Sequence, residues 1–80
     1  MIALAKTEKE WAERAARHLK AELKRADVTY EELAERLKAH GFNETKASIA
    51  NKLARATVSA AFFLACLAAL ELQGVRLEDI

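Results

Sequence analysis

The side chains best suited to bind another molecule lie in residues 45–55. On the outer side of a helix, this segment would carry cationic, amide and hydroxyl groups, at Lys46, Ser48, Asn51, Lys52 and Arg55. Ammonium and guanidinium groups bind phosphate, and the amide of Asn51 has the shape to pair with an adenine edge. A merely solvated helix face usually mixes acids with its lysines, and acids are missing here. A solvated surface remains the simpler interpretation for an isolated helix, but the missing acids make residues 45–55 the place where a partner is expected.

The sequence carries no recognisable arrangement for catalysis, for a metal or for a cofactor. Cys66, His18 and His40 lie in separate segments without ligand spacing. Nothing beside Cys66 would activate its thiol, so we expect it to be a small buried hydrophobe. Acids such as Glu31 and Glu32 are adequately explained as charges at the start of a helix. We therefore expect neither an enzyme nor a small-molecule substrate.

The composition predicts an all-α fold. The chain has 80 residues, of which 18 are Ala and 11 are Leu, with no Pro, two Gly and three Val. Strands and tight hairpins lack the residues from which they are usually built. We expect one domain over residues 1–80, a compact bundle of four to five helices with a short closing segment. So short a chain has a small core, which favours dimerisation or very regular helix packing.

The net charge of +1 conceals alternating bands of charge. Residues 6–25 sum to +3, residues 26–37 to −3, residues 38–55 to +3 and residues 56–80 to −2. This banding excludes a uniformly basic nucleic-acid clamp but allows a single basic helix on a balanced domain.

A reduced, cytoplasmic setting is the expected location. A single Cys cannot form an internal disulfide, and the first residues lack the pattern of a signal peptide. The uncharged run of residues 56–70 is shorter than the roughly 18 residues that a spanning helix needs, so we expect a buried helix and no membrane partner.

Capping signals place the first two helices. Thr7 with Glu10 has the form of a capping box before a helix over residues 8–25, whose apolar face includes Trp11, expected as an anchor in the core or a dimer seam. Thr29 with Glu32 starts a second helix over residues 30–40, where Val28 and Leu33 have staple spacing. The second helix should end near His40, with Gly41 taking a left-handed conformation.

Two further helices follow, over residues 45–55 and 60–71. Asn43 or Thr45 would cap the third, and Ser59 would cap the fourth. In the fourth helix nearly every side chain is apolar, and its expected core residues are Phe63, Leu64, Leu67 and Leu70. This assignment would leave Phe62 exposed, as a candidate dimer surface beside that of residues 8–25. The closing segment would cover a core edge with Val75, Leu77 and Ile80.

Residues 26–80 resemble the helix-turn-helix domain of the lambda-repressor-like class. Residues 28–37, Val-Thr-Tyr-Glu-Glu-Leu-Ala-Glu-Arg-Leu, are similar to its first helix. Residues 49–56, Ile-Ala-Asn-Lys-Leu-Ala-Arg-Ala, resemble its recognition helix, with Ala56 in place of a Gly. The closing Gly-Val-Arg-Leu-Glu-Asp-Ile also resembles that class. From residue 11 onward, the chain is similar to an uncharacterised bacterial domain family of unknown function, which implies a fold but no activity.

The resemblance implies a helix laid into the major groove, and two features depart from it. The connection over residues 38–44 is longer than the tight turn of the class. Tyr30 stands where the class often has a Gln, and its hydroxyl can still donate to a phosphate near the start of the second helix.

Two functions are therefore kept open. The first is a small DNA-binding transcriptional regulator that acts as a homodimer and reads the major groove with residues 45–55. The second is a protein-interaction or self-assembly module that keeps the helix-turn-helix bundle without binding DNA. The near-neutral charge, the long connection and the long first helix support the second.

Overall fold

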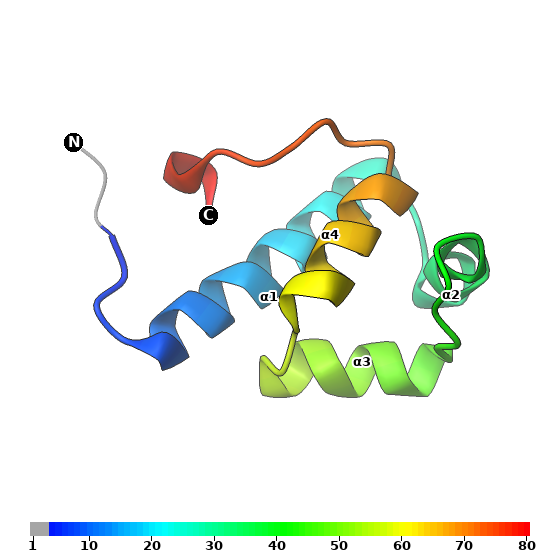
Figure 1. Cartoon of the computed structure of the whole chain (residues 1–80), viewed down its shortest axis with the longest axis horizontal. Helices are drawn as coiled ribbons and strands as arrows, with labels where there is room; N and C mark the ends of the chain where they lie inside the picture. Colours follow the sequence, from blue (N-terminus) through cyan, green and yellow to red (C-terminus); the bar gives the residue numbers. More distant parts are fainter. Residues whose placement is uncertain (1–3) are drawn as a thin grey trace.

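The chain folds into an all-α bundle, as expected from its composition (Figure 1). The computed structural model describes residues 4–80. Its elements are α1 (Glu8–Ala26), α2 (Tyr30–Lys38), α3 (Lys46–Arg55), α4 (Ala60–Ala69) and a closing 3-10 turn, η1 (Leu77–Asp79). The predicted helices agree with these bounds to within two residues. Helices α2 and α4 each end two residues before the predicted end, because the chain turns out of the helix before His40 and Glu71.

Each helix starts at a hydroxyl side chain that accepts a hydrogen bond from the backbone N–H three residues ahead. The four caps are Thr7, Thr29, Thr45 and Ser59. The predicted capping box of Thr7 with Glu10 forms only in part. The Glu10 carboxylate accepts from the N–H of Lys6, one residue before the cap, and not from that of Thr7. The reciprocal capping box belongs to α3, where it joins Thr45 and Ser48.

Each helix also ends in the same kind of turn. One residue takes a positive φ, and the N–H of the next residue donates to a carbonyl five positions back. The positive-φ residues are Asp27, Gly41, Ala56 and Glu71. The donors are Val28, Phe42, Thr57 and Leu72, with N···O distances of 2.9–3.1 Å. Only Gly41 adopts this conformation freely, so the other three helix ends carry backbone strain.

The core lies where α4 packs across α1 and α2, with α3 closing one side. Its largest fully buried side chains are Phe62, Leu19, Leu33, Leu37, Ile49 and Cys66. The expected buried Cys and the staple pair of α2 are confirmed.

The predicted facing of α4 is wrong in two places. Phe62 is 1% exposed and lies in the core, whereas Leu64 is 64% exposed. Because its ring is buried, Phe62 does not provide the exposed aromatic that was expected at a dimer surface. Because α4 is apolar all round, its own pattern cannot indicate which side turns inward. Contacts with other segments decide which side of α4 turns inward. The ring of Phe42 meets that of Phe62 edge to face, with 6.0 Å between the ring centres.

Two other apolar side chains are less buried than expected. Trp11 is 36% exposed on the first half of α1, so it is not a core anchor. After α4 the chain runs back across α1 (Figure 1), where Val75 and Ile80 are half-buried. Leu77 points to solvent instead and is 57% exposed.

Candidate nucleic-acid interface on α3

Helix α3 is held from two sides and leaves one face open. Ile49 and Leu53 are buried against the bundle, and both α1 and α2 contact the helix. The open side, which we call the outer face of α3, consists of exposed residues at helical spacing, Ala47, Asn51, Ala54 and Arg55. Two small side chains beside an amide and a guanidinium form a surface that can approach another molecule closely.

The connection before α3 is long but firmly held. It covers residues 39–45, more than the three or four residues of a common helix-turn-helix turn. Phe42 inserts its half-buried ring against Phe62, and Glu44 reaches forward to α3. The extra length therefore anchors the start of α3 and does not cover its outer face.

The side chain of Ser48 is hydrogen-bonded to residues at the start of its own helix. Its Oγ accepts from the N–H of Thr45 at 2.8 Å and donates to Glu44 at 2.7 Å. The backbone N–H of Ser48 in turn donates to the Thr45 hydroxyl at 3.0 Å. A hydroxyl with these partners is not presented to a ligand.

Lys52 also has partners within the chain. Its ammonium group pairs with the Glu44 carboxylate and lies 4.7 Å from the centre of the Phe62 ring. Burial alone would raise the pKa of the Glu44 carboxyl, but the hydrogen bonds from Lys52 and Ser48 and the charge of Lys52 outweigh it and hold the pKa below its ordinary value. The acid that the sequence pattern lacks on this helix therefore comes from the turn before it.

The two remaining predicted residues lie where α2 and α3 begin. The ammonium group of Lys46 is 3.5 Å from the carboxylate of Glu31, and both side chains are mostly exposed. Such a pair contributes little and can exchange for a phosphate. Tyr30 is half-buried and packs against the core at the first position of α2. The structure thus brings Tyr30 and Lys46 to the same end of the outer face, and Arg55 lies at the other end.

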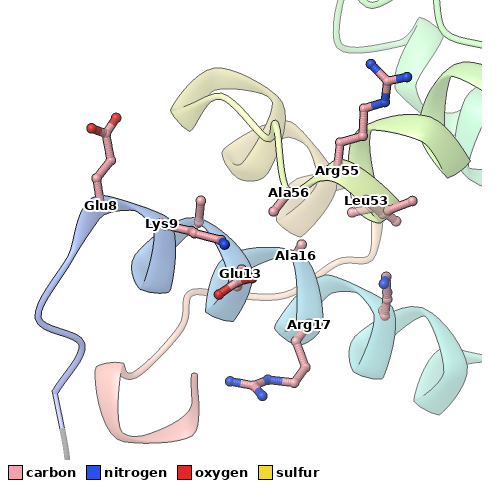
Figure 2. Close-up of a pocket in the computed structure, with 11 residues that line it drawn as sticks. Glu8, Lys9, Glu13, Ala16, Arg17, Leu53, Arg55 and Ala56 are labelled. Carbon is pink, nitrogen blue, oxygen red and sulfur yellow. The ribbon is translucent and has the colours of Figure 1, made fainter.

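A groove between α1 and α3 adds cations that the sequence analysis did not name. Its volume is about 540 Å³, and its floor is formed by small or apolar side chains, with Leu53, Ala16 and Ala56 among them. In Figure 2, Arg55 and Arg17 extend from its two sides in opposite directions. Further charges line it, at Glu8, Lys9, Glu13 and Lys20.

The cations of this region differ in how they are paired. Within residues 4–80, Lys9, Arg17, Lys20, Lys24 and Arg55 have no ion-pair partner, whereas Lys46 and Lys52 have one each. The charge available to an anionic ligand therefore lies on α1 and at the end of α3. The +3 sum of residues 6–25 was the available signal, but the sequence does not place that face of α1 beside α3.

Over residues 4–80, no group of three or more His, Cys, Asp or Glu side chains is placed to hold a metal ion. None of the helices in that range has the length and apolar content needed to cross a membrane.

Most of the chain matches a known domain family. Residues 11–75 match the model of a domain of unknown function, DUF6471. No curated protein and no solved structure matches the chain. Because the match covers most of its length, the chain belongs to the DUF6471 family of domains of unknown function.

Proposed function

We propose that this protein is a small double-stranded-DNA-binding module, acting as a transcriptional regulator and as a homodimer, that inserts α3 into the major groove. The observation that carries the proposal is the outer face of α3. There Asn51 and Arg55 are exposed beside two alanines, on a helix that α1 and α2 hold at the surface. An unobstructed helix face with an amide and a guanidinium suits the edges of bases and the phosphates beside them.

The contacts divide into reading and positioning. Asn51 is the candidate for an adenine edge, and Arg55 for a phosphate or a guanine. Lys46 and Tyr30 lie at the α2 end of the face, where a phosphate could replace the Glu31 carboxylate beside Lys46. Lys52 and Ser48 were expected to contact the duplex directly, but their partners within the chain support an indirect part, in which they fix the start of α3.

The groove cations extend this interface along α1. Lys20 and Lys9 line the groove beside Arg55. Phosphate contacts supply most of the affinity of a duplex for a protein and carry little sequence information. We assign sequence reading to α3 and a share of the backbone contacts to α1.

The test compares two exposed arginines, the unpaired Arg55 on the outer face of α3 and Arg76 in the closing segment, which is paired with Glu78. Arg55→Gln should weaken binding to a labelled duplex about tenfold at low salt and reduce the salt slope by about one. Arg76→Gln, the same change in the exposed closing segment, should leave both unchanged. Asn51→Ala should reduce the preference for sequences enriched from a random duplex pool, by about 1 to 3 kcal/mol for the affected base. Equal effects of the two arginine changes would contradict the proposal.

A self-assembly module is the second candidate, because α4 exposes an apolar side chain, Leu64. The double variant Lys20→Glu with Arg55→Glu separates the two functions, since neither residue is buried. Loss of DNA binding with unchanged oligomeric state supports the first function. Loss of oligomerisation in the double variant would favour the second.

A further inference from the structure

One side of α4 is apolar and is left uncovered by the described part of the chain. The helix contains no charged residue, and Leu64 at its middle is 64% exposed. Ala61 and Ala68 are exposed one turn before and one turn after Leu64, and Ala65, half-buried against the core, borders them, so the four residues follow the three- and four-residue steps of a helix seam. We call these four residues the α4 face. Single exposed leucines are common, but here the surrounding helix surface is apolar as well.

The ends of α4 carry complementary charges. The first turn has no acid, whereas the first turns of α1 and α2 each contain two. The positive end of the α4 dipole is therefore capped by the neutral hydroxyl of Ser59 and has no acid of its own. At the other end Arg36 donates to the carbonyl of Ala69 at 3.1 Å, which compensates the negative end. Just beyond it, Glu71 is exposed and has no ion-pair partner within residues 4–80.

We propose that the α4 face binds the α4 face of a second copy of this chain in an antiparallel arrangement. A two-fold axis beside Leu64 would bring the two leucines together and pack the alanines of each helix against the other. The same axis places each Glu71 next to the N-terminal end of the opposite α4, which has no acid, and it sets the two helix dipoles antiparallel. A parallel pair would instead bring the two Glu71 side chains together.

The size of the α4 face sets the expected affinity of the dimer. A helix of ten residues is about 15 Å long, so the contact is small and the dimer should be weak and concentration-dependent. The surface differs from both dimer surfaces expected from the sequence. It shares no residue with the outer face of α3. The dimer is part of the proposed function, but its surface is argued from α4 alone.

Sedimentation velocity of the full chain, from about 1 to about 500 µM, tests the surface. The wild-type protein should pass from monomer to dimer over this range. Leu64→Glu should weaken self-association at least about tenfold, because it places two carboxylates at the axis. Leu77→Glu, the same change at an exposed leucine outside α4, should behave as wild type. Circular dichroism checks that each variant keeps its helices.

A charge exchange tests the antiparallel arrangement. Ala60→Glu puts an acid near Glu71 of the opposite chain, and Glu71→Lys puts a cation near a positive helix end, so each alone should weaken the dimer. The two changes together should restore it, because the new charges attract each other across the interface. A wild-type monomer throughout the range, or equal loss in the Leu64 and Leu77 variants, would overturn the proposal. Failure of the exchange to restore association would overturn the antiparallel arrangement. No nucleic acid is present, so these outcomes are independent of DNA binding.

Discussion

The ammonium group of Lys52 lies 4.7 Å from the centre of the Phe62 ring, at the boundary between α3 and the core. The same group pairs with Glu44, whose carboxylate also accepts from Ser48. These contacts tie the connection before α3, α3 itself and α4 together. A lysine that the sequence pattern assigns to a ligand therefore stabilises the fold that presents the neighbouring residues.

The Glu44 cluster should make stability depend on pH. The folded state holds the pKa of Glu44 below its ordinary value of 4.5, so its stabilising effect is complete above that value and is lost as pH falls through the folded pKa. Glu44→Gln should lower the free energy of unfolding by about 1 to 2 kcal/mol at neutral pH. The difference from wild type should disappear in acid, as urea unfolding across a pH series would reveal.

The matched control is Glu35→Gln. Glu35 pairs with Lys38 at 3.0 Å, but both side chains are largely exposed. The control should therefore cost about 0.5 kcal/mol or less at neutral pH. If the Glu44 and Glu35 variants lost the same stability, the assigned role of the Glu44 cluster would be wrong.

The strained helix ends predict a stabilising substitution. Ala56 ends α3 with a φ of 55°, a conformation that suits glycine better than alanine. Ala56→Gly should stabilise the protein by about 1 kcal/mol, which raises Tm by roughly 4 to 8 °C in a domain of this size. Ala54→Gly, the same change inside α3, should instead destabilise by about 0.5 to 1 kcal/mol. Thermal unfolding that gave both changes the same sign would contradict the assignment.

Cys66 should be unreactive toward thiol reagents in the folded protein. Burial, with a smaller effect from the charge of Glu44, raises the pKa of its thiol to about 12. A thiol reagent at neutral pH should therefore react only as fast as the protein opens, and at once in denaturant. Leu64→Cys provides the control, because a thiol at that exposed position of the same helix should react immediately. Immediate labelling of Cys66 in the native protein would contradict its burial.

The sequence predicted the elements well because their signals are local. Each helix start has a hydroxyl cap within three residues of the group that it serves, and Gly41 marks the end of α2 directly. The facing of α4 could not be predicted, because an all-apolar helix has no polar side to turn outward. For this reason Phe62 was predicted to be exposed and Leu64 to be buried, the reverse of what the structure has.

The candidate site was predicted in part. Asn51 and Arg55 lie on the outer face, where the helical spacing had placed them. The partners of Lys46 and Lys52 come from α2 and from the preceding connection, so only the folded chain brings them into contact. The contribution of α1 was missed because a sum of charges does not indicate which neighbour a helix face meets.

Binding of the wild-type protein to a labelled random-sequence duplex, followed by fluorescence anisotropy across a salt series, tests the central claim most directly. We expect binding at micromolar protein in about 50 mM salt, with a slope of about −3 to −5 per protomer in log affinity against log salt. Such a slope corresponds to the unpaired cations of α1 and α3 meeting phosphates. No detectable binding at that salt and protein concentration would contradict the claim.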